Sequence, residues 1–73
     1  MCGVIGLIGN PQASREVLIG LTLLQHRGQD SAGILTFDQN GFHYVRDLGL
    51  VEQVFTSENA KTLTGEVALG HVR

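Results

Sequence analysis

The sequence predicts an α+β fold, and three observations support this prediction. Residues 2–8 form an apolar, strand-like run, residues 12–25 carry apolar side chains at helical spacing, and an Asn-Gly pair at 40–41 separates two further strand-like runs. The predicted order of elements is strand, helix, strand, strand, short helices and strand. A chain of 73 residues has room for one small domain at most.

The first predicted strand, Cys2–Ile8, is apolar on both of its faces. Val4 and Ile8 face one side, and Ile5 and Leu7 face the other. A strand with two apolar faces is typical of a layered structure, so we expect both sides of this strand to be covered.

The predicted helix runs from about Gln12 to Gln25. Val17, Leu21 and Leu24 recur at helical spacing and give it an apolar stripe. Gly20 lies inside this helix, where glycine costs roughly 1 kcal/mol relative to alanine. Its presence predicts that the helix lies close to a neighbouring element.

Turn and cap residues predict where the elements begin and end. Asn10 or Ser14 is expected to cap the amino end of the helix, and Gly28 is expected to follow its last turn. Later in the chain, Ser57 is a candidate cap and Gly65 a candidate stop for short helical turns.

The second half of the chain predicts a hairpin and a final strand. The runs 32–37 and 42–48 flank the Asn-Gly pair, which is the strongest short signal for a β-hairpin. Residues 50–65 predict short helical turns, and a last strand begins near Val67.

Composition excludes several classes of function. Five Lys and Arg against seven Asp and Glu give a net charge of −2, and aromatic residues make up 5% of the chain. These values argue against a surface for nucleic acid or anionic membrane. We also find no apolar run of about 20 residues, as a membrane span requires. The single cysteine cannot form an internal disulfide and fits a reducing, cytoplasmic compartment.

Cys2 directly follows the initiator methionine. Methionine is generally removed before a small residue, which would leave Cys2 with a free α-amine beside its thiol. These two groups titrate within about one pH unit of each other in peptides, so the amine can accept the proton of the thiol. Cys2 is therefore a candidate nucleophile with its own base, and Gly3 leaves room for a substrate carbonyl. The alternative is that Cys2 is a small buried hydrophobic residue.

Polar residues gather where the predicted helix ends. Arg27 either favours the helix dipole or helps to hold a site at the entrance of the loop. Asp30 and Ser31 are expected to satisfy turn amides. We do not predict a Ser/His/Asp triad from His26 and Ser31, because no orienting partner is evident.

His71 and Arg73 lie two residues apart, so in a strand they share a face with Val67 and Leu69. This face changes from apolar to polar, as in a strand that runs from a core into a pocket. Arg73 is suited to a bidentate grip on a carboxylate, whereas His71 is expected to be a hydrogen-bonded structural residue. The alternative for both is a solvated strand end.

Three motifs resemble the glutamine amidotransferases that have an N-terminal nucleophile cysteine (class II). They are "MCGVIGLIG" at the start, "LQHRGQDSAGI" at 24–34 and "GHVR" at 70–73, and they cover the whole length of the chain. Within the family, Gln25, His26 and Gln29 make the second motif most similar to amidophosphoribosyltransferases. Glucosamine-6-phosphate synthases, which the chain also resembles, tend to read "RGYDSAG" there.

The resemblance implies a four-layer αββα sandwich of the N-terminal-nucleophile hydrolase type, of which this chain supplies the first part. It implies that Cys2 attacks the side-chain amide of glutamine, releasing ammonia and forming a thioester that water hydrolyses to glutamate. Arg73 matches the position that grips the α-carboxylate of glutamine. Arg27 and Gly28 match the substrate-binding loop beside the nucleophile.

The resemblance also implies that residues 1–73 are an incomplete glutaminase domain. The oxyanion hole and a phosphoribosyltransferase domain are expected beyond Arg73. There, in a complete enzyme expected to be a homo-oligomer, ammonia would displace pyrophosphate from phosphoribosyl pyrophosphate with Mg²⁺ present, giving phosphoribosylamine for purine synthesis. No cofactor or metal is expected within the segment. We expect the segment alone to be inactive, because losing one oxyanion donor already costs about 10²–10³ in rate.

Two alternatives remain open at this point. The first is a glutaminase domain that feeds another acceptor, such as a hexose phosphate. The second is a non-catalytic α+β binding module in which Cys2 is only part of the core.

Overall fold

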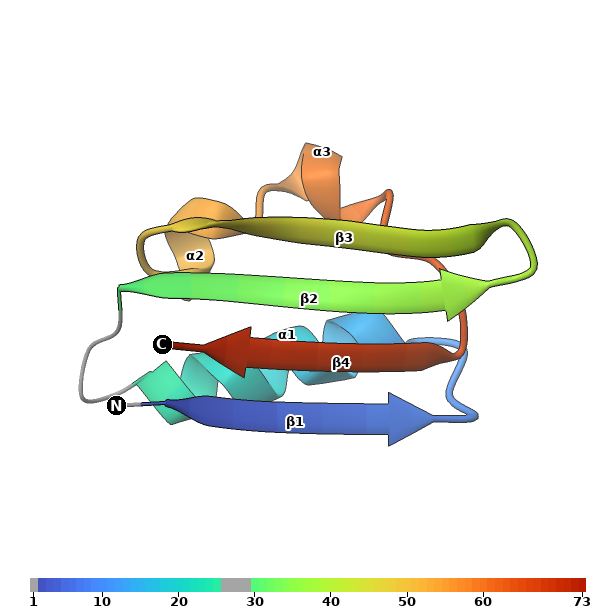
Figure 1. The fold of residues 1–73 in the computed structure, drawn as a ribbon, viewed down its shortest axis with the longest axis horizontal. Helices are drawn as coiled ribbons and strands as arrows, with labels where there is room; N and C mark the ends of the chain where they lie inside the picture. Colours follow the sequence, from blue (N-terminus) through green and yellow to red (C-terminus); the bar gives the residue numbers. More distant parts are fainter. Residues whose placement is uncertain (1, 26–29) are drawn as a thin grey trace.

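The computed structural model describes residues 2–25 and 30–73 of the chain. The elements within these ranges follow the predicted order (Figure 1). They are β1 (Gly3–Ile8), α1 (Ala13–Leu24), β2 (Ser31–Asp38), β3 (Gly41–Leu48), α2 (Val51–Val54), α3 (Ser57–Ala60) and β4 (Val67–Val72).

The strands form one antiparallel sheet in the order β1-β4-β2-β3. The last strand in the sequence is therefore an inner strand, and it lies between the first strand and the hairpin. Val72 of β4 pairs with Gly3 of β1 on one side and with Ala32 of β2 on the other. This arrangement brings the two ends of the described chain to the same end of the sheet (Figure 1).

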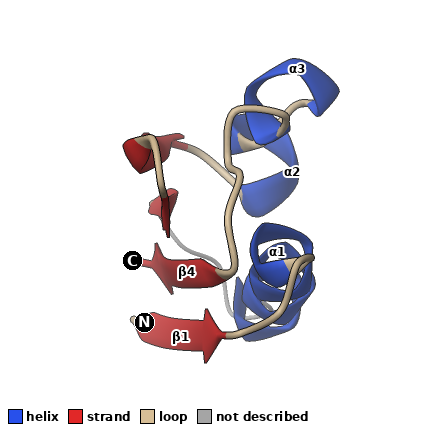
Figure 2. Cartoon of the chain, turned by 90° about the vertical axis from the view of Figure 1, so that its right-hand side faces the viewer, coloured by secondary structure: helices blue, strands red, loops and turns tan. Residues whose placement is uncertain are grey.

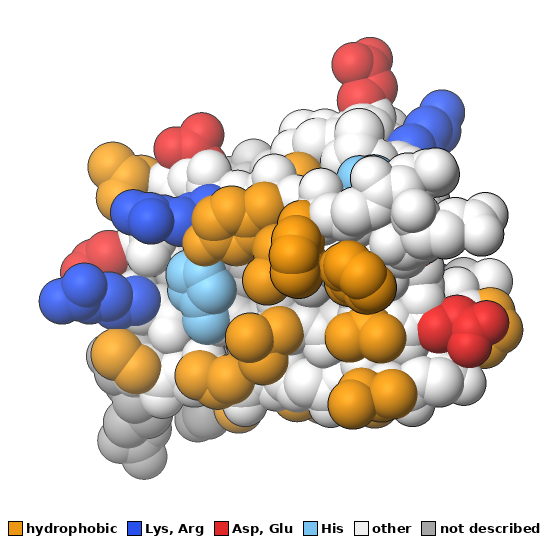
Figure 3. Space-filling view, turned by 45° about the vertical axis from the view of Figure 1, so that its right-hand side comes forward, with side chains coloured by type: hydrophobic (Ala, Val, Ile, Leu, Met, Phe, Trp, Pro, Cys, Tyr) orange, Lys and Arg blue, Asp and Glu red, His pale blue; other side chains and the backbone are white. Residues whose placement is uncertain are grey.

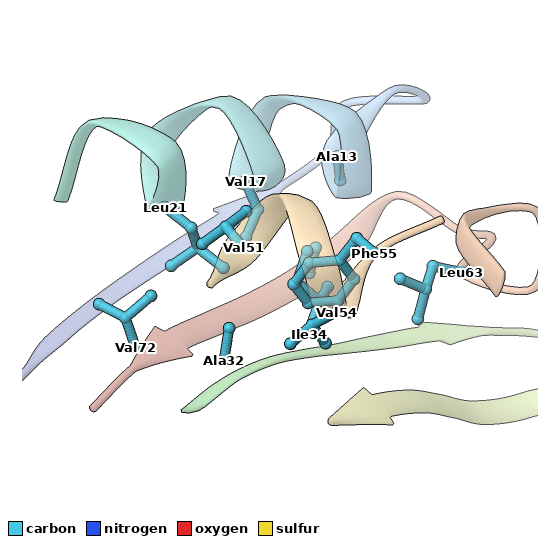
Figure 4. Packing of buried hydrophobic residues seen from close by; sticks show 11 residues of the cluster. Ala13, Val17, Leu21, Ala32, Ile34, Val51, Val54, Phe55, Leu63 and Val72 are labelled. Atoms are coloured by element: carbon cyan, nitrogen blue, oxygen red, sulfur yellow. The ribbon is translucent and has the colours of Figure 1, made fainter. Parts of the chain in front are cut away.

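The described helices cover one face of the sheet, so these elements form two layers (Figure 2). The core lies between the layers (Figure 4). Its buried apolar residues are Ala13, Val17, Leu21, Ala32, Ile34, Val51, Val54, Phe55, Leu63, Ala68 and Val72. The helical stripe is confirmed at Val17 and Leu21, whereas Leu24 is 38% exposed.

Two glycines let α1 lie close to the sheet. A Cβ on Gly20 would come within 2.3 Å of Ile5 Cδ1, and a Cβ on Gly70 within 2.4 Å of Val17 Cγ1. The close approach predicted at Gly20 is confirmed.

The other face of the sheet is apolar and open. The prediction that both sides of the first strand are covered is wrong for the described chain: Val4 and Ile8 are 69% and 84% exposed, while Ile5 and Leu7 pack against the core. The reason is topological, because the described helices lie on one side of the sheet. Apolar side chains from all the strands gather on this open face (Figure 3), namely Val4, Ile8, Phe37, Phe42, Tyr44, Val67 and Leu69.

The bounds of α1, Ala13–Leu24, lie within one residue of the prediction, but its amino-terminal cap differs. The residue before the helix is Gln12, which makes no side-chain cap, and Ser14 lies inside the helix. Asn10 acts one step earlier, since its Oδ1 accepts the N–H of Gln12 at 2.7 Å and so shapes the turn that precedes the helix. The predicted role of Gly28 falls outside the described residues.

The residues predicted to cap and to end the short helices, Ser57 and Gly65, are also wrong. Thr56, not Ser57, caps α3: its Oγ1 accepts the N–H of Asn59 at 3.1 Å, and Asn59 Oδ1 accepts the N–H of Thr56 at 2.8 Å. This reciprocal pair is a capping box, and Ser57 has no residue at the matching position that could complete one. The helix ends at Ala60, well before Gly65.

The predicted hairpin is confirmed. Asp38 pairs with Gly41, so two residues connect β2 to β3, and Gly41 has a φ of 111°. Asp38 Oδ1 accepts the N–H of Asn40 at 2.9 Å, which fixes the turn.

No helix in the described ranges is long and apolar enough to cross a membrane.

Candidate functional site

Cys2 and Arg73 lie at the same end of the sheet. Cys2 directly precedes β1, Arg73 directly follows β4, and the adjoining residues Gly3 and Val72 pair with each other. Strand alternation places Cys2 on the face of Val4, and Arg73 on the face of His71. Val4 and His71 are themselves paired, so the thiol and the guanidinium belong to the same end of the open face.

The backbone at Arg73 is anchored to the start of β2. Its N–H donates to the carbonyl of Ser31 at 2.9 Å, and its carbonyl accepts the N–H of Ser31 at 3.1 Å and the N–H of Asp30. The main chain of Asp30 and Ser31 supplies these contacts, and the expectation that the two residues satisfy turn amides stays a prediction. They fix the position of the residue that carries the guanidinium.

The side chains at this end are free to meet a ligand. Cys2 and Arg73 are exposed, and within residues 2–25 and 30–73 neither side chain makes a hydrogen bond or an ion pair. The predicted site residues Arg27 and Gly28 lie outside the described residues.

Gly3 has a packing role. A Cβ at this position would lie 3.0 Å from Leu24 Cδ1, so the missing side chain lets β1 lie close to the end of α1. The idea that Gly3 leaves room for a substrate carbonyl stays a prediction.

His71 is held by a hydrogen bond, in keeping with the structural role expected for it. Its Nε2 lies 3.1 Å from the hydroxyl of Tyr44 in β3. Within the described chain, however, its face does not start from a core. Val67 and Leu69 are 37% and 49% exposed, whereas the alternate residue Ala68 faces the helices and is buried.

A polar cluster at the opposite end of the sheet has no counterpart in the sequence predictions. Asp38 accepts hydrogen bonds from the hydroxyl of Thr64, from the ring of His43 and from the backbone of Asn40. These contacts, that of Thr64 most strongly, lower the pKa of Asp38 to about 2. The bond to Asn40 is local and follows from the turn sequence, but the contact with Thr64 depends on tertiary structure.

Gln25, which belongs to the second motif, joins two helices. Its Oε1 accepts the N–H of Val51 at 2.9 Å, and its Nε2 donates to Glu52 at 3.0 Å. The second contact lowers the pKa of Glu52. Gln25 thereby fixes the end of α1, from which the chain leads towards Asp30.

The described residues contain no group of three or more His, Cys, Asp or Glu side chains that could hold a metal ion. The carboxylate of Asp38 contacts the imidazole of His43 through one oxygen and the hydroxyl of Thr64 through the other, so these three side chains form a structural cluster.

No family model matches the chain. Comparison with curated proteins, however, gives matches that cover the whole length of this chain. The chain is 49% identical over 99% of its length to amidophosphoribosyltransferase 3, chloroplastic, of Arabidopsis thaliana, and covers 14% of that protein. It is 43% identical over its whole length to the amidophosphoribosyltransferase of Escherichia coli K12, and covers 15% of it.

Solved structures give the same result. The chain matches a structure described as the allosteric regulatory enzyme of purine biosynthesis with a TM-score of 0.91 and 36% identity, over the whole chain and 16% of that structure. It matches the glutamine phosphoribosylpyrophosphate amidotransferase of B. subtilis with a TM-score of 0.89 and 36% identity, again over the whole chain and 16% of the other.

The chain thus spans about one seventh of the length of these relatives. It has the α+β fold of their N-terminal domain. In sequence and in fold, the chain is similar over its whole length to one part of the amidophosphoribosyltransferases, which are glutamine amidotransferases with an N-terminal nucleophile.

Proposed function

We propose that this chain is the nucleophile-bearing part of a glutaminase, which releases ammonia from glutamine for an amidophosphoribosyltransferase reaction. One observation carries the proposal: the thiol of Cys2 and the guanidinium of Arg73 occupy neighbouring positions at one end of the open face, and neither has a hydrogen-bond or ion-pair partner among residues 2–25 and 30–73. A non-catalytic module would not need an exposed cysteine beside an exposed arginine there. The matches also do not favour a hexose phosphate as the acceptor.

In this proposal the α-amine of mature Cys2 accepts the proton of the thiol. The sulfur then attacks the carbonyl carbon of the glutamine side-chain amide and forms a tetrahedral intermediate. The amine returns the proton to the leaving nitrogen, the C–N bond breaks, and ammonia leaves a thioester on Cys2. Water attacks this thioester, which gives glutamate and restores the thiol.

Arg73 binds the α-carboxylate of glutamine in this proposal, because a guanidinium can donate two parallel hydrogen bonds to a carboxylate. Its anchored backbone supports the role, since a fixed main chain limits the positions available to the guanidinium. We assign Arg27 and Gly28 to the same substrate site.

For the whole protein, we propose that ammonia displaces pyrophosphate from phosphoribosyl pyrophosphate, giving phosphoribosylamine for purine synthesis. The names of the relatives support this acceptor. Mg²⁺ would neutralise pyrophosphate in a separate phosphoribosyltransferase domain. We further propose that the whole protein forms a homo-oligomer and that it is located in the cytoplasm. The relative from Arabidopsis thaliana is named as chloroplastic.

The test is Cys2→Ala in the full-length protein that carries this segment, with Ser57→Ala on an exposed helical turn as the control. We expect Cys2→Ala to abolish glutamine-dependent product formation, because no nucleophile remains. Product formation from free ammonia should persist, because ammonia bypasses the glutaminase site. Glutamine-dependent activity in the Cys2→Ala variant would refute the proposal.

A further inference from the structure

His71 lies two residues before Arg73 on the open face, so it borders the proposed glutamine site. It has a neighbour on each side in the sheet: Val4 of β1 and Gly33 of β2. Its side chain can therefore lean towards β1, where Cys2 is, or towards the hairpin.

The structure shows the second orientation. The imidazole passes over Gly33, and its Nε2 lies 3.1 Å from the hydroxyl of Tyr44, which belongs to β3 two strands away. The path depends on glycine: a Cβ at Gly33 would lie 2.4 Å from Nε2 and 3.0 Å from Cε1 of His71. The ring thus occupies the space that a side chain on β2 would otherwise fill.

This orientation leaves the side of β4 that faces Cys2 clear of the ring. A change of rotamer at His71 would swing the ring towards Val4 and into the space beside Cys2 and Arg73. The contact with Tyr44 opposes this change, because it would be lost in the swung orientation.

We propose that Tyr44 is a positioning residue that acts through His71: it holds the imidazole over Gly33 and so keeps the glutamine-binding space open. The inference rests on the proposed function. A ring that enters this space competes with glutamine, so it lowers the fraction of protein able to bind. Binding of glutamine should suffer, whereas the attack by Cys2 on bound glutamine should not.

The test is Tyr44→Phe in the full-length protein, measured as glutamine hydrolysis with and without His71→Ala. The net free energy of one hydrogen bond corresponds to about a two- to tenfold change in the equilibrium constant between the two orientations of the ring. We therefore expect KM for glutamine to rise by at most about that factor and kcat to stay within about twofold. In the His71→Ala background, Tyr44→Phe should have no effect on KM, because no ring remains to be held.

Gly33→Ala provides an independent variant, since its Cβ would displace the same ring. It should raise KM in the presence of His71 and raise it less in the His71→Ala background. Gly6→Ala is the matched control on the same face, because its Cβ would meet Leu69 Cδ1 at 3.5 Å and the carbonyl oxygen of Ala68 at 3.7 Å, both ordinary contact distances. Melting temperatures of all variants identify any that fail to fold.

Two results would overturn the inference. Tyr44→Phe could change KM equally with and without His71, or it could leave KM unchanged. Cys2→Ala, measured in parallel, separates this failure from that of the proposed function. If Cys2→Ala is inactive and Tyr44→Phe leaves KM unchanged, the role of Tyr44 alone is refuted. If Cys2→Ala still hydrolyses glutamine, the proposed function itself is refuted.

Discussion

The two ends of the sheet use polar side chains in opposite ways. At the hairpin end, the carboxylate of Asp38 accepts hydrogen bonds from Asn40, His43 and Thr64. At the other end, the backbone is hydrogen-bonded, but the side chains of Cys2 and Arg73 have no such partner within the described ranges. The difference is that one end is closed by its own side-chain contacts, while the other leaves the thiol of Cys2 and the guanidinium of Arg73 exposed.

The largest expected effect is on stability at the hairpin end, in Gly65→Ala. Gly65 has a φ of 116°, and a Cβ there would lie 2.3 Å from the carbonyl oxygen of Phe37. Strain and overpacking together should cost about 3 kcal/mol. Hydrogen exchange of the β2 and β3 amides in the full-length protein measures this loss locally.

Gly41→Ala is the matched control for Gly65→Ala. Gly41 has a similar φ of 111°, but nothing lies within 4 Å of its added Cβ. Backbone strain alone should cost about 1 kcal/mol. Equal effects of the two substitutions would show that the close contact with Phe37 is unimportant.

The next largest effect is on binding at the other end. Arg73→Ala should raise KM for glutamine by about 10- to 100-fold, because a charge-assisted hydrogen bond contributes about 1.5–3 kcal/mol. Amide exchange in the hairpin should not change, since the guanidinium makes no contact there. Arg73→Lys keeps the charge but loses the paired geometry, so its KM should be intermediate. A KM unchanged in Arg73→Ala would remove this residue from the site.

Asp38→Asn should produce a smaller effect that depends on pH. Folding lowers the pKa of this carboxyl from 3.8 to about 2, mainly through Thr64. The carboxylate therefore stabilises the hairpin end fully above about pH 4, and this contribution is lost as the pH falls towards 2. Amide exchange in the hairpin should be faster in Asp38→Asn than in the unmodified protein at pH 6, with a difference that shrinks towards pH 3. A difference that is constant over this range would contradict the assignment.

The smallest effect is expected between the two ends, at Thr36. Its hydroxyl is buried and makes no hydrogen bond within the described part of the chain. Thr36→Val replaces it with a methyl group of similar size, so it should stabilise β2 by about 1 kcal/mol. Amide exchange of the strand core would measure the gain. A loss of stability instead would mean that the hydroxyl has a partner in the full-length protein.

Local patterns predict the elements of this fold well, because each depends on residues close in sequence. The strand at Cys2–Ile8, the stripe of α1 and the hairpin at Asn40 and Gly41 all follow from periodicity or turn chemistry. The cap at Thr56 can also be predicted from the sequence, because Asn59 stands three residues later and completes a capping box.

The site depends on contacts that no local pattern contains. That Cys2 and Arg73 become neighbours requires β4 to insert between β1 and β2, which only the assembled sheet shows. The path of His71 over Gly33 to Tyr44 and the bond from Thr64 to Asp38 likewise join residues far apart in sequence. Motif resemblance can supply the site residues, but the structure supplies their arrangement.

The most direct test of the central claim uses the amine of Cys2. Ammonia release from glutamine is measured for the full-length protein with a free amino-terminal Cys2 and for the same protein with that amine blocked by acetylation or a retained methionine, each state verified by intact mass. We predict that the blocked protein releases no ammonia from glutamine above background, although the thiol is still present. Equal rates in the two forms would contradict it, because the thiol would then need no base at its own terminus.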